Sequence, residues 1–186
     1  YHYDHRKMFL IDGKTAYTGG YTLQASSRET KHDMMVKAEG SVVNQMQASF
    51  FRTLLYNKGT VETGTAEELR NRYFPPPTVT DGGEARLELN VPRYRHTLTD
   101  SYLREIDAAK TYLYIINPYI TNDEIVKKIC AAAKRGVDVR IVHPGTAENP
   151  LNDTNTRYHF EEMLKAGVKI YLYQGEKGLG KLHGKG

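Results

Sequence analysis

Hydrophobic and polar positions in the first part of the chain follow the spacing of strands and then of a helix. The unbroken apolar run 8–11 predicts a buried strand that ends at the turn Asp12-Gly13, which leads to residues 14–18 and then to Gly19-Gly20. Apolar side chains recur at every second position over 34–39 and at helical spacing over 43–54. We therefore expect strands followed by one amphipathic helix whose apolar stripe faces the core.

The second part of the chain alternates between strand and helix patterns. The expected strands are 86–91, 112–117, 137–142 and 168–173, and the expected helices are 100–110, 123–135 and 156–166. This rhythm predicts a largely parallel sheet with helices on its faces. Sites in such sheets lie at the carboxyl ends of strands, where Asn117, Tyr119 and His143 are found. We expect these residues to line a cleft.

A segment rich in proline and glycine separates the two parts. It contains Pro75-Pro76-Pro77 and Asp81-Gly82-Gly83, with a short helical pattern at 66–73 before them. We therefore predict a first half at 1–59, a linker at 60–83 and a second half at 84–186.

Composition sets limits on the classes of function. The 186 residues are 39% apolar and 26% charged, which is typical of a globular protein, and no apolar run approaches the ~20 residues that span a bilayer. A net charge of +4 mildly favours phosphate esters, anionic lipid or nucleic acid as ligands. Cysteine and histidine are not clustered at the spacing of metal ligands, so we expect neither a metal nor another cofactor.

The pattern His-x-Lys occurs near both ends of the chain, as His5-Arg6-Lys7 and as His183-Gly184-Lys185. Alternate side chains of a strand point to the same side, so each histidine is expected beside its lysine. This pair suits a phosphate, because the imidazole attacks phosphorus or moves a proton while the ammonium neutralises the oxygens.

The first copy continues with Asp12 and the pair Gly19-Gly20, and this longer pattern resembles the phospholipase D superfamily. Further stretches similar to the family are 32–40, 115–120 and 133–141, closest in wording to the bacterial cardiolipin synthase and phospholipase D branch. The second copy stops before its aspartate. We interpret the chain as a fragment that needs the rest of the parent chain to complete its fold.

The resemblance implies an α/β phospholipase D-like fold, with two pseudo-repeated α/β/α halves, mostly parallel sheets and one active site between them. It also implies a two-step displacement in which His5 attacks phosphorus and forms a phosphohistidine. His183 then acts as general acid and base, and the reverse assignment stays open. Lys7 and Lys185 would hold the non-bridging oxygens.

Other site residues follow from the same resemblance. Asp33 matches the acid that orients the first histidine, so we expect it to hold His5 unless it is a solvated loop carboxylate. The acid for His183 would then lie beyond Gly186. Asp12 belongs to the motif but is expected to fix a turn. The expected substrate contacts are Gly19, Gly20, Thr22, Asn117 and Tyr119, and Thr22 stands where relatives carry asparagine.

A phospholipid is the expected substrate, in hydrolysis or in phosphatidyl transfer, with peripheral contact to a bacterial membrane. A nuclease is the second hypothesis, and nucleic acid is the less favoured partner because the chain has no strongly basic stripe. A third hypothesis is a non-catalytic module that binds phosphate or membrane.

Overall fold

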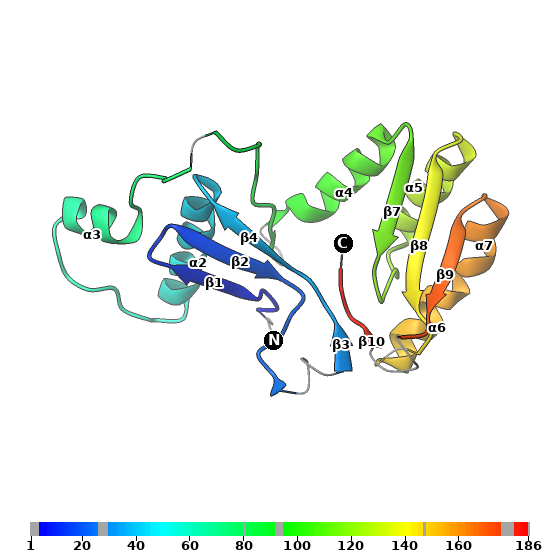
Figure 1. The fold of residues 1–186 in the computed structure, drawn as a ribbon, viewed down its shortest axis with the longest axis horizontal. Coiled ribbons are helices and arrows are strands. Elements are labelled where there is room, and N and C mark those ends of the chain that lie inside the picture. The colour runs from blue at the N-terminus through cyan, green and yellow to red at the C-terminus, as the bar shows by residue number, and fades with distance from the viewer. Residues whose placement is uncertain are drawn as a thin grey trace. The chain divides into compact units, whose positions relative to one another are not determined.

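The chain folds into two compact units, shown as a ribbon in Figure 1. The computed structural model describes residues 4–25, 30–79, 81–91, 95–146, 148–175 and 181–185. The first unit contains residues 1–19 and 35–87, and the second contains 20–34 and 88–186. The proline-rich segment expected as a linker is thus part of the first unit, and the loop before residue 35 is part of the second.

An antiparallel sheet forms the centre of the first unit, in the order β1 (Met8–Ile11), β2 (Thr15–Gly19) and β4 (Met35–Glu39). Asp12 and Gly13 both have positive φ, 54° and 64°, and reverse the chain between β1 and β2. A turn this short joins only antiparallel neighbours. This sheet therefore differs from the mostly parallel sheets expected for both halves.

Two helices complete the first unit (Figure 1). Helix α2 (Val42–Tyr56) confirms the amphipathic helix predicted at 43–54, and its Val43 and Met46 pack with Ala16 of β2 in a buried cluster. Helix α3 (Ala66–Tyr73) is preceded by its N-cap Thr65, whose side chain accepts a hydrogen bond from the backbone N–H of Glu68 while the Glu68 carboxylate accepts one from the backbone N–H of Thr65, a capping box.

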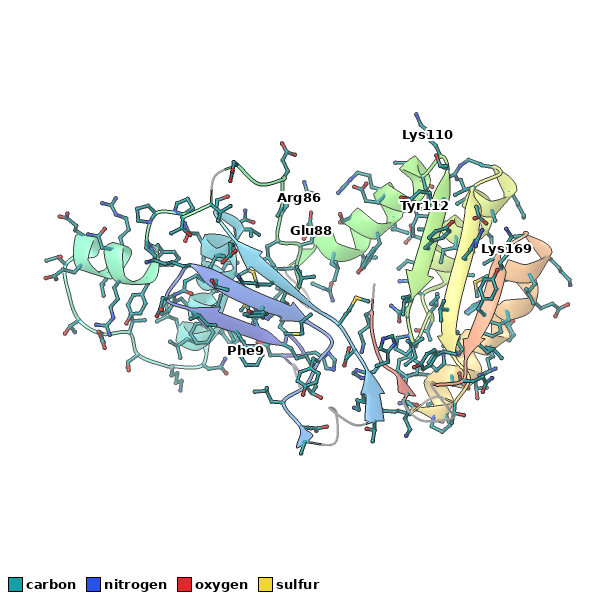
Figure 2. All side chains as sticks on the ribbon, viewed as in Figure 1. Phe9, Arg86, Glu88, Lys110, Tyr112 and Lys169 are labelled. Carbon is teal, nitrogen blue, oxygen red and sulfur yellow. The ribbon has the colours of Figure 1, made fainter. Side chains whose placement is uncertain are left out.

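A parallel sheet forms the centre of the second unit and confirms the predicted mixed α/β class. Its strands are β7 (Tyr112–Ile116), β8 (Asp138–Pro144) and β9 (Lys169–Tyr173), and the helices that pack with it in the described residues after 95 are α4 (Thr97–Ala108), α5 (Asp123–Lys134), α6 (Pro150–Tyr158) and α7 (Phe160–Lys165). Alternate strand residues such as Val139 and Ile141 are buried against α5 and α7. Tyr112 and Lys169 lie on the opposite face of the sheet (Figure 2).

Two elements differ from the sequence pattern. The strand expected over 86–91 is only β5 (Asn90–Val91), paired with β6 (Arg95–His96). The helix expected over 156–166 is two helices, because α6 already starts at Pro150 and ends at Tyr158. Its early start has a local cause: the Asn149 side chain caps the helix by accepting a hydrogen bond from the backbone N–H of Asn152.

A short parallel pair that the sequence pattern did not reveal brings distant segments together in the second unit. Strand β3 (Lys31–His32) pairs with β10 (Lys181–Leu182), with Leu182 opposite His32. Both β3 and β10 are described, whereas residues 176–180 before β10 lie outside the described residues. In the part of the chain that the structure describes, no helix combines the length and the apolar character needed to cross a bilayer.

Candidate active site

The second His-x-Lys motif is built onto the β3–β10 pair. The backbone N–H groups of His183 and Gly184 both donate to the carbonyl oxygen of His32, each at 2.9 Å. This anchors the His183 ring beside Asp33, whose Oδ2 lies 2.8 Å from Nδ1. The Asp33 side chain is only 2% exposed and that of His183 is 16% exposed. The pair is therefore largely shielded from solvent.

The motif resemblance predicts that Asp33 orients His5. The structure corrects this prediction, because the Asp33 carboxylate is hydrogen-bonded to His183. The expectation that the acid for His183 lies beyond Gly186 is wrong for the same reason. The physical cause is the β3–β10 pairing, which places residues 150 positions apart in contact. Sequence spacing carries no signal of that pairing.

The Asp33 carboxylate determines which nitrogen of His183 is available for chemistry. A carboxylate accepts hydrogen bonds, so when the His183 ring is neutral the proton on Nδ1 is held by Asp33 and the lone pair is on Nε2. Lys185 is placed beside the same ring, with its Nζ 3.1 Å from Nδ1 and 3.3 Å from Nε2. A base or nucleophile nitrogen and a cation are thus presented together, as phosphoryl chemistry requires.

Gly20 fixes the position of the Asp33 carboxylate. Its N–H donates to the carbonyl of Met34 at 3.0 Å, and a Cβ added at Gly20 would lie 2.1 Å from Oδ1 of Asp33. The N–H of Met34 also donates to that Oδ1, at 3.3 Å. Only glycine leaves room for the carboxylate here, which explains the second glycine of the motif.

Gly20→Ala is expected to push Asp33 away from His183 and to shift the imidazole away from the Nδ1–H tautomer. A hydrogen bond to a charged group contributes about 1.5–3 kcal/mol, so the tautomer ratio should change by at least roughly tenfold. Imidazole nitrogen and proton NMR signals measure this ratio. Gly83→Ala is the matched control, because a Cβ there meets nothing within 4 Å. Unchanged His183 signals in Gly20→Ala would contradict the prediction.

The first motif, in the first unit, repeats the local arrangement of the second. Lys7 Nζ lies 3.1 Å from Nδ1 of His5 and donates to the His5 carbonyl at 2.8 Å. This confirms that each histidine and its lysine point the same way. Arg6 between them reaches Thr53 of α2 and pairs with Asp4, and the hydrogen bond from Arg6 lowers the pKa of that carboxyl. His5 itself is exposed.

The other predicted site residues are spread over both units. Asp12 lies in the turn after β1, whereas His5 lies before the other end of that strand. Gly19 is the last residue of β2 and pairs with Met35 of β4. Thr22 is half-buried in the loop after Gly20. The structure therefore groups Gly20, Asp33, His183 and Lys185 in the second unit, while His5, Lys7, Asp12 and Gly19 belong to the first.

Asn117 and Tyr119 follow β7, and their side chains organise the loops at this end of the sheet. The Asn117 Oδ1 accepts a hydrogen bond from the N–H of Tyr119 at 3.0 Å. The Tyr119 hydroxyl oxygen accepts one from the N–H of Asn149 at 3.0 Å. Both side chains thus have structural contacts at the place where substrate contacts were predicted.

His143 is not a cleft residue, contrary to the expectation from its position after a strand. Its ring is fully buried, with Nε2 2.7 Å from Oδ1 of Asp153, and this burial lowers the pKa of His143. Arg157 bonds the other oxygen of Asp153 at 2.8 Å and the carbonyls of Pro144 and Gly145 at 3.2 Å each. This network fastens the loop that follows β8.

Two charged residues near His183, Lys31 and Glu148, were not predicted from the sequence. Glu148 Oε1 pairs with Lys31 Nζ at 3.2 Å, and its Oε2 lies 4.0 Å from Nε2 of His183. Glu148 follows the carboxyl end of a parallel strand, the edge where sites are expected, and this was the signal that could have found it. Among the described residues, no group of three or more His, Cys, Asp or Glu side chains could hold a metal ion.

Comparisons with known proteins support the resemblance seen in the motifs. Residues 102–186 match the family described as "Cardiolipin synthase, PLD-like domain". The chain is 28% identical over 181 residues to cardiolipin synthase 1 of Bacillus cereus, covering 92% of this chain and 36% of that protein.

Two further relatives have descriptions of the same kind. Identity is 30% over 178 residues to the probable cardiolipin synthase YwiE of Bacillus subtilis, covering 92% of this chain and 35% of that protein. It is 32% over 201 residues to cardiolipin synthase A of Cronobacter sakazakii, covering 97% and 38%. The chain thus spans little more than a third of the length of these relatives, and the predicted resemblance is confirmed.

Proposed function

The chain contains a phospholipase D-like domain of the cardiolipin synthase type, and from that premise we propose that it transfers phosphatidyl groups between phospholipids. The observation that carries the proposal is the Asp33–His183–Lys185 cluster, in which a shielded carboxylate holds Nδ1 of the histidine beside the lysine cation. Hydrolysis is the same reaction with water as acceptor.

The mechanism that we propose has two displacements at phosphorus. In the first, a nitrogen of His5 forms a bond to phosphorus while the bond to the leaving alcohol breaks, and His183, which enters this step as the imidazolium, gives that alcohol its Nε2 proton and becomes neutral. In the second, the acceptor hydroxyl loses its proton to His183 and bonds to phosphorus as the phosphorus–His5 bond breaks. Lys7 and Lys185 neutralise the phosphate oxygens in both steps, which removes the need for a metal.

This mechanism requires the two motifs to form one active site, and that is part of the proposal. The geometry that supports it is the equivalence of the motifs. In each, the lysine Nζ lies 3.1 Å from the histidine Nδ1 and donates to the carbonyl of the same histidine. A phosphate bound between two such pairs would meet an imidazole and a cation on each side. Substrates of this kind also imply contact with a membrane surface.

The test uses the longest natural chain that contains residues 1–186, incubated separately with vesicles of labelled phosphatidylglycerol and with labelled single-stranded DNA. We expect turnover of the lipid to a doubly phosphatidylated product, with the DNA intact. The His5→Ala variant should lose the lipid reaction. Cleavage of DNA without lipid turnover would replace this function by a nuclease, and inactivity on both would favour a binding module.

A further inference from the structure

Glu148 lies beside the nitrogen of His183 that exchanges the proton. Its Oε1 is held by Lys31 at 3.2 Å, so its Oε2 is the oxygen that faces Nε2, at 4.0 Å. The Lys31 side chain is 14% exposed and that of Glu148 is 35% exposed. The carboxylate is therefore held by Lys31 through one oxygen, while its side chain remains accessible to small molecules.

The backbone around Glu148 is fastened on both sides. Before it, Arg157 donates to the carbonyls of Pro144 and Gly145. After it, the N–H of Asn149 donates to the Tyr119 hydroxyl, and the side chain of Asn149 caps α6. Anchors this close to Glu148 keep its carboxylate near His183, as a recognition group requires.

The gap of 4.0 Å between Oε2 and Nε2 is too long for a direct hydrogen bond and wide enough for hydroxyl oxygens to contact both atoms. A single alcohol hydroxyl has one hydrogen, and in the second step that hydrogen must point to Nε2 of His183. It then has none for the carboxylate. A neighbouring hydroxyl on the next carbon supplies the missing donor, so a vicinal diol satisfies both groups together.

We propose that Glu148 selects the acceptor by binding the second hydroxyl of a vicinal diol, the group found in glycerol, while the first hydroxyl reacts. This inference rests on the proposed function, because it concerns the acceptor of the same transfer. The first hydroxyl gives its proton to Nε2 of His183, and its oxygen bonds to phosphorus as the phosphorus–His5 bond breaks. Glu148 accepts the hydrogen bond of the second hydroxyl and exchanges no proton.

The test compares 1,2-propanediol with 1-propanol as acceptors, because the two differ by one hydroxyl. Transfer from a labelled phosphatidyl donor is measured in the longest natural chain that contains residues 1–186. We expect Glu148→Ala to lower the ratio of kcat/KM for diol over monohydric alcohol about tenfold, chiefly through a higher KM for the diol. Glu148→Gln, which keeps a neutral acceptor, should fall between Glu148→Ala and wild type.

Glu161→Ala is the matched control, since Glu161 is likewise paired with a lysine, Lys165, but on the exposed surface of α7. It should leave the ratio unchanged. An equal fall in the rates of both acceptors in Glu148→Ala would overturn the proposal, because it would show an effect on His183 and not on the acceptor. An unchanged ratio would also overturn it. A wild-type chain that transfers to neither alcohol and does not consume the donor would reject the proposed function itself.

Discussion

Replacing Asp33 by asparagine is expected to lower kcat for phosphatidyl transfer about 10³- to 10⁴-fold while the fold is retained. The carboxylate accepts the Nδ1 proton of His183 at 2.8 Å and is almost fully buried, so it fixes the tautomer and stabilises the imidazolium that forms. An amide has no charge and can present N–H groups to Nδ1 instead. The measurement is the steady-state rate with saturating phosphatidylglycerol.

Asp12→Asn is the control for Asp33→Asn, because it makes the same change in an aspartate of the first motif. Asp12 lies in the turn that closes β1, at the end of the strand away from His5. We expect its rate to stay within about tenfold of wild type, with the loss appearing as lower stability. Comparable losses of kcat in the two variants, at equal stability, would contradict the role assigned to Asp33.

Removing either motif histidine is expected to abolish transfer, with a rate loss of at least about 10⁴-fold, but at different steps. His5→Ala should retain no label from the phosphatidyl donor, because the nucleophile is missing. His183→Ala should accumulate labelled protein when the donor is a phosphatidyl ester of p-nitrophenol. Its leaving group, p-nitrophenolate, departs without needing a proton from His183. Label retained after denaturation, compared with p-nitrophenolate release, separates the two steps.

His32→Ala is the matched control for these variants. The His32 side chain is exposed and stacks on Tyr173, while its backbone carbonyl, which the substitution keeps, holds His183 and Gly184. Its rate should stay near wild type. Label retained in His5→Ala and absent from His183→Ala would assign the nucleophile to His183.

Much of the local structure could be predicted because it depends on neighbours in sequence. The apolar run over 8–11, the helical stripe over 43–54 and the strand–helix alternation after residue 100 became β1, α2 and the parallel sheet. The early start of α6 at Pro150 was missed because a capping contact of Asn149 outweighed the apolar periodicity. The antiparallel sheet of the first unit was missed although its short turn was visible.

The sequence by itself determined which functional groups are present: two His-x-Lys pairs, an acid at Asp33 and a glycine pair. Together they predict phosphodiesters as the substrate class. Only the tertiary structure decided which groups act on which. The pairing of β3 with β10 assigned Asp33 to His183, and the fastened loop after β8 placed Glu148 beside the same ring. The physical reason is that strand pairing and loop anchoring join residues far apart in the chain, and their partners leave no periodic trace in the sequence.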